Sequence, residues 1–394
     1  MPLSRLPTEI TLHITNYLTH SHVTSASLVC RAWRLALIPV LYRSVQLDSD
    51  DRAVQFANTV TSGGVTGVSP HIPRSVRFLR IVQHFRMNGD ITNLGFDLLN
   101  PCMTYFTGLR GLYFHVTGDI VLNNPEFIKL AQTWCPKLET VDLHIQNIDY
   151  QTQIGKHLLT TLFDFKNLVS FSLSSPFISS GISVESLGSL ESLAANCPRL
   201  EIFKLDLSFR DYKGVEFYYT PDIVANSFGK STMPFLHTLH LCDILGQQLE
   251  NFSDFPPTGS HPFRDFLLRH PHIKGFKIGY SATDTKSPNI NPENLARAFP
   301  SLKYFSAPKF LCAKLWRSTL ANRIECLSIQ RGVWDFEGEP ELPPMPMLRQ
   351  LRIDEPDPLE ALKLMGMIMP VACGIEHLRT ETHDIPYSFV SSLI

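Results

Sequence analysis

The chain has 394 residues, of which 44% are hydrophobic and 18% charged, as in a folded protein with a large buried core. Its 35 Lys and Arg nearly balance 37 Asp and Glu, which argues against attraction of the whole chain to nucleic acid or an anionic membrane. No stretch approaches the roughly 18 apolar residues of a membrane-spanning helix, and no secretory signal is visible. We therefore expect a cytoplasmic or nuclear protein, or one found in both compartments, with no nucleic-acid or membrane partner.

The first residues predict a helix that runs to Leu18. Pro7 suits the first helical turn, where its missing N–H has no partner to lose. Ile10, Ile14, Tyr17 and Leu18 recur at helical spacing and form one apolar face.

Two more helices are predicted before residue 47. Ser21 is the expected N-cap of a short second helix, and Val29, Trp33 and Leu37 mark a third helix that Pro39 is expected to end. The three helices together carry more apolar residues than so small a bundle can bury. A partner that covers the excess is implied.

Several fixed spacings in this segment are those of a known family. They join Leu6, Pro7, Glu9, Ile10, Leu18, Ser27, Leu28, Val29, Cys30, Trp33, Pro39, Leu41 and Tyr42. The segment 1–47 therefore resembles an F-box. The resemblance implies that it docks on a Skp-family adaptor and, through that adaptor, joins a cullin-RING ubiquitin ligase. The residues implied to contact the adaptor, or to shape the surface that does, are Leu6, Pro7, Ile10, Ile14, Leu18, Leu28, Val29 and Trp33. The alternative is an ordinary helical cap whose apolar side chains turn inward.

Residues 48–75 predict a linker made of a helix and a turn-rich loop. The acidic run at 48–51 lacks the glycine and the distal glutamate of a calcium loop, so it fits a helix N-terminus better. Phe56 and Val60 are spaced four apart within that helix.

From residue 76 to residue 394 one short pattern returns, apolar-x-x-apolar-x-apolar. Its first and last residues in eleven successive occurrences are Val76/Ile81, Leu109/Phe114, Leu138/Leu143, Leu168/Leu173, Leu200/Leu205, Leu236/Leu241, Ile273/Ile278, Leu302/Ala307, Ile324/Ile329, Leu348/Ile353 and, weakly, Ile375/Thr380. Successive occurrences lie 22 to 37 residues apart. Tyr42, Val45 and Leu47 fit as an earlier instance that would join the F-box to the array.

Helical patterns separate these strands, and a proline after Cys135, after Cys197 and at position 300 stops the helix before the next strand. The unit resembles a leucine-rich repeat, although the asparagine that usually follows the strand is absent. We expect an α/β repeat: a three-helix F-box followed by a curved leucine-rich-repeat solenoid, with parallel strands on the concave face and helices on the convex face. A doubly wound α/β fold is the alternative, but its strands would be apolar throughout. The strands expected here contain polar residues, such as Lys204 in the occurrence that ends at Leu205.

Residues suited to chemistry are few. The eight cysteines show no zinc or disulfide pattern, so Cys135 and Cys197 are expected as buried thiols. The segments His20-Ser21-His22 and His270-Pro271-His272 are expected as solvated loops, and Trp134, Trp316 and Trp334 as core. No nucleotide-binding, metalloprotease or hydrolase motif is present. We expect no catalysis, no cofactor and no metal.

One row of strand residues is expected to point away from the core, since side chains alternate along a strand. The row is Arg80, Tyr113, Asp142, Ser172, Lys204, His240, Lys277, Ser306, Ser328, Arg352 and Arg379. It is either a solvated face or a basic groove for an acidic or phosphorylated client, with Arg80, Tyr113, Lys204, His240, Lys277, Arg352 and Arg379 as the binding residues.

These features together favour a substrate receptor of a Skp-cullin-F-box ubiquitin ligase, whose F-box binds the adaptor and whose repeats bind a client protein. A non-degradative scaffold built from the same two parts is the alternative. An enzyme with a site hidden between repeats is a third hypothesis, which no motif supports.

Overall fold

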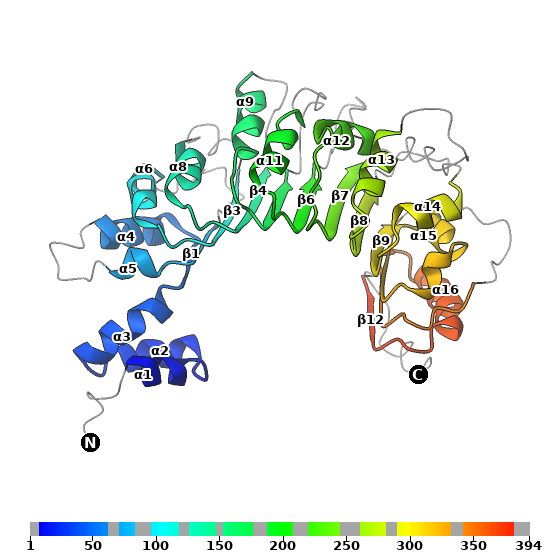
Figure 1. Ribbon diagram of the computed structural model, residues 1–394. Helices are drawn as coiled ribbons and strands as arrows, with labels where there is room; N and C mark the ends of the chain where they lie inside the picture. Colours follow the sequence, from blue (N-terminus) through cyan, green and yellow to red (C-terminus); the bar gives the residue numbers. More distant parts are fainter. Residues whose placement is uncertain are drawn as a thin grey trace. The chain divides into compact units, whose positions relative to one another are not determined.

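A computed structural model of the chain describes residues 8–61, 71–82, 96–117, 126–146, 153–175, 187–207, 220–244, 261–280, 290–331 and 342–381 (Figure 1). Three helices come first, and short strands then alternate with helices through the remaining described residues. Among those residues, no helix has the length and apolar character needed to cross a membrane.

The helices are α1 (Thr8–Thr15), α2 (His20–Ser27), α3 (Arg31–Leu41), α4 (Asp50–Thr61), α5 (His71–Ser75), α6 (Phe96–Leu99), α8 (Glu126–Trp134), α9 (Gln153–Leu162), α11 (Leu190–Asn196), α12 (Pro221–Ser227), α13 (Pro262–Arg269), α14 (Pro292–Ala298), α15 (Lys309–Trp316) and α16 (Pro358–Ile368), with 3-10 turns η2 (Asn100–Tyr105), η4 (Thr319–Asn322) and η5 (Met369–Val371). The strands are β1 (Ser44–Leu47), β2 (Phe78–Val82), β3 (Gly111–Thr117), β4 (Thr140–Gln146), β5 (Ser170–Ser174), β6 (Ile202–Asp206), β7 (Thr238–Ile244), β8 (Gly275–Tyr280), β9 (Tyr304–Pro308), β10 (Cys326–Gln330), β11 (Gln350–Ile353) and β12 (His377–Thr380).

Within the described residues, twelve strands follow chain order through one sheet, and the strand pairs whose register is resolved are parallel. A doubly wound sheet would reverse its strand order at a switch point, and this one does not. The order confirms the predicted solenoid-like α/β repeat. The earlier instance of the pattern is also confirmed, because Val45 of β1 pairs with Leu79 of β2.

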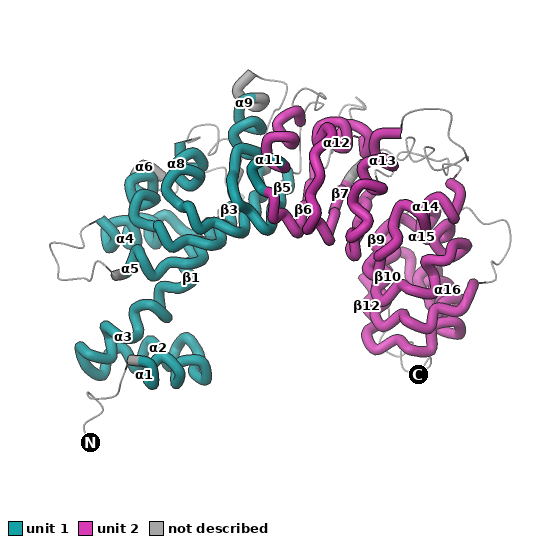
Figure 2. The backbone as a smooth tube through the Cα atoms, in the orientation of Figure 1, with its two compact units in different colours: residues 1–179, 195–197 teal, residues 180–194, 198–394 magenta. Residues whose placement is uncertain are grey.

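The chain divides into two compact units, residues 1–179 with 195–197 and residues 180–194 with 198–394 (Figure 2). The first contains α1 to α3 and strands β1 to β5, and the second contains strands β6 to β12. Each unit has its own core of strand and helix side chains.

Strands β2 to β5 and β7 to β12 each begin with a pair of hydrogen bonds to the preceding repeat. The N–H groups of Arg77 and Phe78 both donate to the carbonyl oxygen of Arg43, at 2.9 and 3.0 Å. In the next repeat the N–H of Arg110 donates to the carbonyl oxygen of Arg77 at 2.7 Å. Because these bonds use only backbone atoms, the repeat tolerates varied side chains at its edge.

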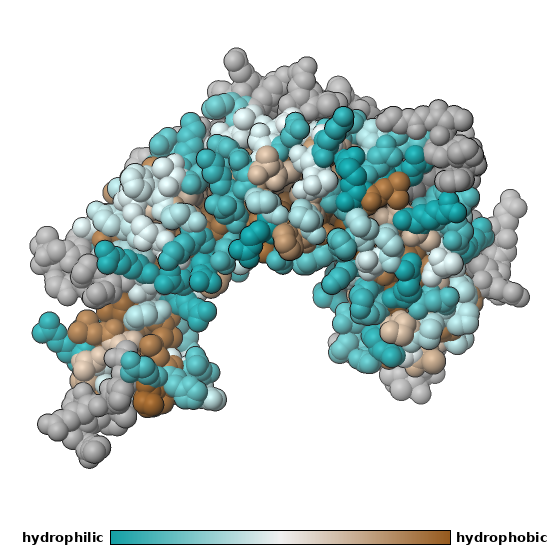
Figure 3. All heavy atoms as spheres, in the orientation of Figure 1, coloured by the Kyte–Doolittle hydropathy of each residue, from teal (hydrophilic) through white to brown (hydrophobic). Residues whose placement is uncertain are grey.

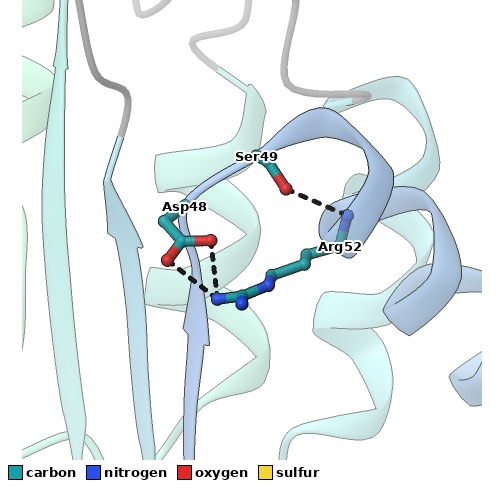
Figure 4. Close-up of polar contacts among 3 residues, drawn as sticks. All are labelled: Asp48, Ser49 and Arg52. Atoms are coloured by element: carbon teal, nitrogen blue, oxygen red, sulfur yellow. Dashed lines mark hydrogen bonds and ion pairs between the residues drawn. The ribbon is translucent and has the colours of Figure 1, made fainter.

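The acidic run after β1 starts a helix, as predicted (Figure 4). The Ser49 hydroxyl accepts a hydrogen bond from the N–H of Arg52 at 3.4 Å, and Arg52 Nη1 lies 2.8 Å from both carboxylate oxygens of Asp48. Asp50 and Asp51 occupy the first turn of α4, where the helix dipole favours negative charge.

Phenylalanine rings fill the space between strands and helices in each unit. In the first unit the rings of Phe114 on β3 and Phe127 on α8 stack at 5.4 Å. In the second, the Phe228 ring lies 5.1 Å from that of Phe203 and 5.3 Å from that of Phe266. Such pairs add packing energy beyond the area that they bury.

The thiols of the repeat turns are structural, as predicted. Burial raises the pKa of Cys135 to about 12 and that of Cys197 to about 11. Cys197 Sγ accepts a hydrogen bond from the N–H of Leu168 and donates to the carbonyl of Phe165, both at 3.4 Å. Thiols with such a raised pKa are poor nucleophiles at neutral pH.

Two predictions about single residues were wrong. His270 lies not in a solvated loop but in the core, with 3% exposure, and its Nε2 accepts the N–H of Met233 at 3.0 Å. Trp134 was expected in the core but is 46% exposed on α8, whereas Trp316 is buried. The burial of a helix residue depends on whether the neighbouring repeat covers the side of the helix on which it lies. The periodicity within one helix does not show which side is covered. His272, His20 and His22 are exposed, the last two on α2, and Trp334 lies outside the described residues.

A buried ion pair joins two late repeats. Lys309, the first residue of α15, places Nζ 2.5 Å from Glu355 Oε2, and both side chains are less than a tenth exposed. Glu360 lies farther away, at 3.9 Å, and its side chain is 42% exposed. The pair ties α15 to the segment that follows β11.

We predict that Glu355→Ala lowers the free energy of unfolding by about 3–5 kcal/mol, because it leaves the Lys309 ammonium buried without its partner. Glu360→Ala is the matched control and should change stability by less than about 1 kcal/mol, since an exposed pair contributes little. Denaturant unfolding of the full chain measures both. Equal effects of the two substitutions would show that Lys309 does not depend on Glu355.

Candidate functional site

Helix α1 buries two threonines and exposes two isoleucines. Thr11 and Thr15 are 4% and 7% exposed, and the Thr15 hydroxyl donates to the carbonyl of Leu12 at 2.6 Å. On the same helix Ile10 is 47% exposed and Ile14 37%. A surface helix normally does the opposite, so this arrangement indicates a surface that another molecule covers.

The end of α2 repeats the inversion. Ser27 is buried and its hydroxyl donates to the carbonyl of Thr24 at 2.6 Å, whereas Leu28 and Val29 are 69% and 64% exposed. The large apolar residues exposed in the described segment 8–41 are Ile10, Ile14, Tyr17, Leu28, Val29 and Leu35, and we call them the bundle face. In Figure 3 hydrophobic residues, in brown, gather over α1 to α3. The alternative of a helical cap with these side chains turned inward is wrong for the residues of this face.

The eight residues implied to contact the adaptor fall into three groups. Ile10, Ile14, Leu28 and Val29 lie on the bundle face. Leu18 and Trp33 are half-buried, so they contribute less exposed area to the surface of the bundle than these four residues do. Leu6 and Pro7 lie outside the described residues. The predicted set omitted Tyr17, although it continues the spacing of Ile10 and Ile14, and Leu35, which lies only two residues after Trp33 and therefore on another side of α3.

The caps of the bundle differ from the prediction. The N-cap of α2 is Thr19, whose Oγ1 accepts the N–H of His22 at 3.4 Å, and not Ser21. The Cys30 thiol caps α3 by accepting the N–H of Trp33 at 3.5 Å. These caps fix where each helix begins, and so which side chains reach the bundle face.

Pro39 was expected to end the third helix, but α3 continues to Leu41. Proline has no N–H to donate to the carbonyl of Leu35, and its ring crowds that carbonyl. The next turn still closes, because the N–H of Tyr42 donates to Ile38 at 3.0 Å.

The central row of the strands, defined as the eleven residues predicted to point away from the core, is placed in line by the register within each unit. Arg80 pairs with Tyr113, Tyr113 with Asp142, and Asp142 with Ser172. In the second unit the pairs run from Lys204 through His240, Lys277, Ser306, Ser328 and Arg352 to Arg379.

Lys204, His240 and Lys277 form the basic part of the row, on β6, β7 and β8. All three are half-buried. Burial, together with the charges of the two lysines, lowers the pKa of His240 from 6.5 to about 3. The imidazole is therefore neutral at physiological pH, and the positive charge here comes from the lysines alone.

Farther along the row the expected basic stripe is interrupted. Ser306 and Ser328 are 2% and 6% exposed, so the expectation that they face solvent was wrong. Arg352 and Arg379 already have a partner: their Nη2 atoms lie 2.6 and 3.1 Å from Glu381 Oε1. These two arginines are less available to a ligand than the two lysines.

In the first unit the row is mixed in charge. Arg80 is exposed and Tyr113 is half-buried, but Asp142 follows them, with His115 Nε2 at 3.7 Å from its carboxylate. The ring of His144 on β4 lies 5.5 Å from that of His115 on β3. Among the described residues, no three His, Cys, Asp or Glu side chains are grouped so that they could hold a metal ion.

Comparison with known proteins agrees with the bundle's geometry. Residues 3–48 match the family model described as F-box-like, the segment that contains the bundle face. No curated protein sequence matches the chain. An F-box-like domain implies a role in binding the adaptor of an SCF-type ubiquitin ligase. The chain thus joins an F-box-like region to a series of short parallel strands and helices consistent with a leucine-rich-repeat array.

Proposed function

We propose that this protein is a substrate receptor of a Skp-cullin-F-box ubiquitin ligase. The observation that carries the proposal is the bundle face, whose large apolar side chains are exposed although Thr11, Thr15 and Ser27 of the same bundle are buried. The match of residues 3–48 to the F-box-like family supports a Skp-family adaptor as the molecule that covers this face. Through the adaptor, the repeats are held near a cullin-RING ligase.

The repeats bind the client in this proposal, and the chain itself catalyses no bond formation. Its contribution is effective concentration, because a client held on the array stays near the activated ubiquitin carried by the ligase. The basic residues Lys204 and Lys277 favour an acidic or phosphorylated client segment, since charge-assisted hydrogen bonds are the strongest available on this face.

We predict that Ile10→Ala with Leu28→Ala weakens adaptor binding by roughly tenfold or more, because a single apolar anchor in a small interface commonly contributes about 2 kcal/mol. The folded chain should keep its stability, since both side chains are already largely exposed. Titration calorimetry with purified adaptor measures the loss. Leu359→Ala is the matched control, because Leu359 is 75% exposed in the second unit and should leave affinity unchanged. Full affinity in the double variant would contradict the docking proposal.

We predict that Lys204→Glu with Lys277→Glu abolishes capture of the client while adaptor binding persists, because the two surfaces use different residues. Capture by the parent should weaken as salt rises, since exposed charges are screened. Mass spectrometry of proteins bound to each variant measures capture. Lys230→Glu is the control, because Lys230 is exposed in the second unit but lies outside the central row.

The pH dependence gives a second readout of the same site. Since the pKa of His240 is lowered to about 3, its charge does not change between about pH 6 and 8, and its contribution to client affinity should stay constant there. A rise in affinity as the pH falls through 6.5 would show that His240 takes up a proton, and would contradict the buried neutral imidazole.

A non-degradative scaffold that uses the same adaptor and repeats is the second candidate, because the bundle face supports adaptor binding whatever follows it. The two are separated by the half-life of a captured client in cells that carry the parent or the Ile10→Ala, Leu28→Ala variant. A receptor predicts a longer half-life with the variant. An unchanged half-life, with adaptor binding lost, favours the scaffold.

A further inference from the structure

A cleft of about 1200 Å³ lies within the first unit, between the three-helix bundle and the edge where the strands begin. Leu35 and Val40 of α3 line one side. The other side carries Arg43, Arg74 and Arg110, with Arg77 among them. This set of arginines belongs neither to the predicted adaptor residues nor to the central row.

The fold itself brings the arginines together. Arg43, Arg77 and Arg110 occupy the same position in successive repeats, directly before β1, β2 and β3. Neighbouring strands lie about 4.8 Å apart, so these side chains emerge one strand spacing from each other. Arg74 joins them from the last turn of α5.

One arginine of the set has a structural role. Arg77 is half-buried and its Nη1 donates to the carbonyl of Gly108 at 2.8 Å. A Cβ atom at Gly108 would collide with that nitrogen, so the glycine permits the close approach. Arg77 is therefore committed to the fold.

The other three are available to a ligand. Arg43 and Arg74 are exposed, and in the described part of the chain neither has an ion-pair partner. Arg110 reaches Glu139 only at 3.9 Å, and its side chain is 55% exposed. Guanidinium groups gathered at one place repel each other, and carboxylates on a ligand would relieve that repulsion while accepting paired hydrogen bonds.

The cleft is continuous with the bundle face. Leu35 belongs to that face, with 48% exposure, and also lines the cleft. A protein that covers the bundle face therefore reaches the arginines without leaving the surface. Four arginines line the cleft against the carboxylates of Glu9 and Glu139, so charge complementarity calls for an acidic occupant.

We propose that the partner which covers the bundle face places an acidic segment in this cleft, where its carboxylates bind Arg43, Arg74 and Arg110. The inference rests on the proposed function, in which that partner is the adaptor. Apolar contacts on the helices then supply much of the affinity, and the arginines fix the orientation of the bound partner.

The test compares the full chain with its Arg43→Glu, Arg74→Glu variant. Adaptor affinity is measured at increasing salt, and a labelled oligoglutamate peptide serves as a separate probe of the cleft. The parent should bind the peptide in a salt-sensitive manner. The variant should lose peptide binding, bind the adaptor roughly tenfold more weakly at low salt, and show a shallower salt dependence.

Two further variants keep the result interpretable. Arg199→Glu with Arg331→Glu reverses two exposed arginines of the second unit and should leave both measurements as in the parent. Arg43→Gln with Arg74→Gln removes the charge without adding repulsion and should give an intermediate loss. Thermal unfolding of each variant confirms that it is folded.

The outcomes separate this inference from the proposal on which it rests. Unchanged adaptor affinity and salt dependence in the Arg43→Glu, Arg74→Glu variant would overturn the acidic segment and leave the adaptor proposal intact. Peptide binding without any effect on the adaptor would likewise show that the acidic occupant does not come from that partner. Failure of the parent to bind the adaptor at all would overturn both.

Discussion

Parallel backbone pairing between successive repeats is the constraint on which the rest of this structure depends. Each described repeat contributes one short strand, and the N–H groups at the starts of β2 to β5 and β7 to β12 donate to a carbonyl of the repeat before. A single short strand of this kind cannot be stable alone, so each repeat folds only against its neighbours. The same ladder determines that residues at equivalent positions, such as Arg43, Arg77 and Arg110, lie side by side. Surfaces made of one residue from each repeat follow directly from it.

The two candidate surfaces arise from different physical causes. The bundle face exists because α1 and α2 satisfy their inward hydroxyl groups locally, as the Thr15 and Ser27 hydroxyls do by donating to backbone carbonyls of their own helices. Buried polar groups that are satisfied in this way cost little, which leaves the apolar side chains free for a partner. The basic part of the central row, by contrast, exists because the pleat turns Lys204 and Lys277 away from the core.

Much of the repeat could be predicted from the sequence, because one apolar pattern recurs along the chain with polar residues between its apolar positions, which fits strands covered on one face only. The alignment of Lys204, His240 and Lys277 followed from the same pattern and is confirmed by the register. The burial of Ser306 and the pairing of Arg352 with Glu381 could not be predicted, since both depend on segments from other repeats. Whether the apolar residues of the bundle face solvent or the core likewise could not be predicted from periodicity alone. It required the family resemblance or the structure.

The place of β1 has a consequence for how such proteins can be divided or recombined. The strand lies within the segment that matches the F-box-like family, yet it pairs with β2 as the first member of the sheet. Cutting the chain at residue 47 would therefore expose the backbone groups of β2 as a new edge, ready to pair with another chain. A truncated protein that aggregates would then report an unprotected edge and not a lost partner. A replacement N-terminal module would need to bring its own terminal strand, so the F-box and the array are joined as one folding piece and are not freely exchangeable parts.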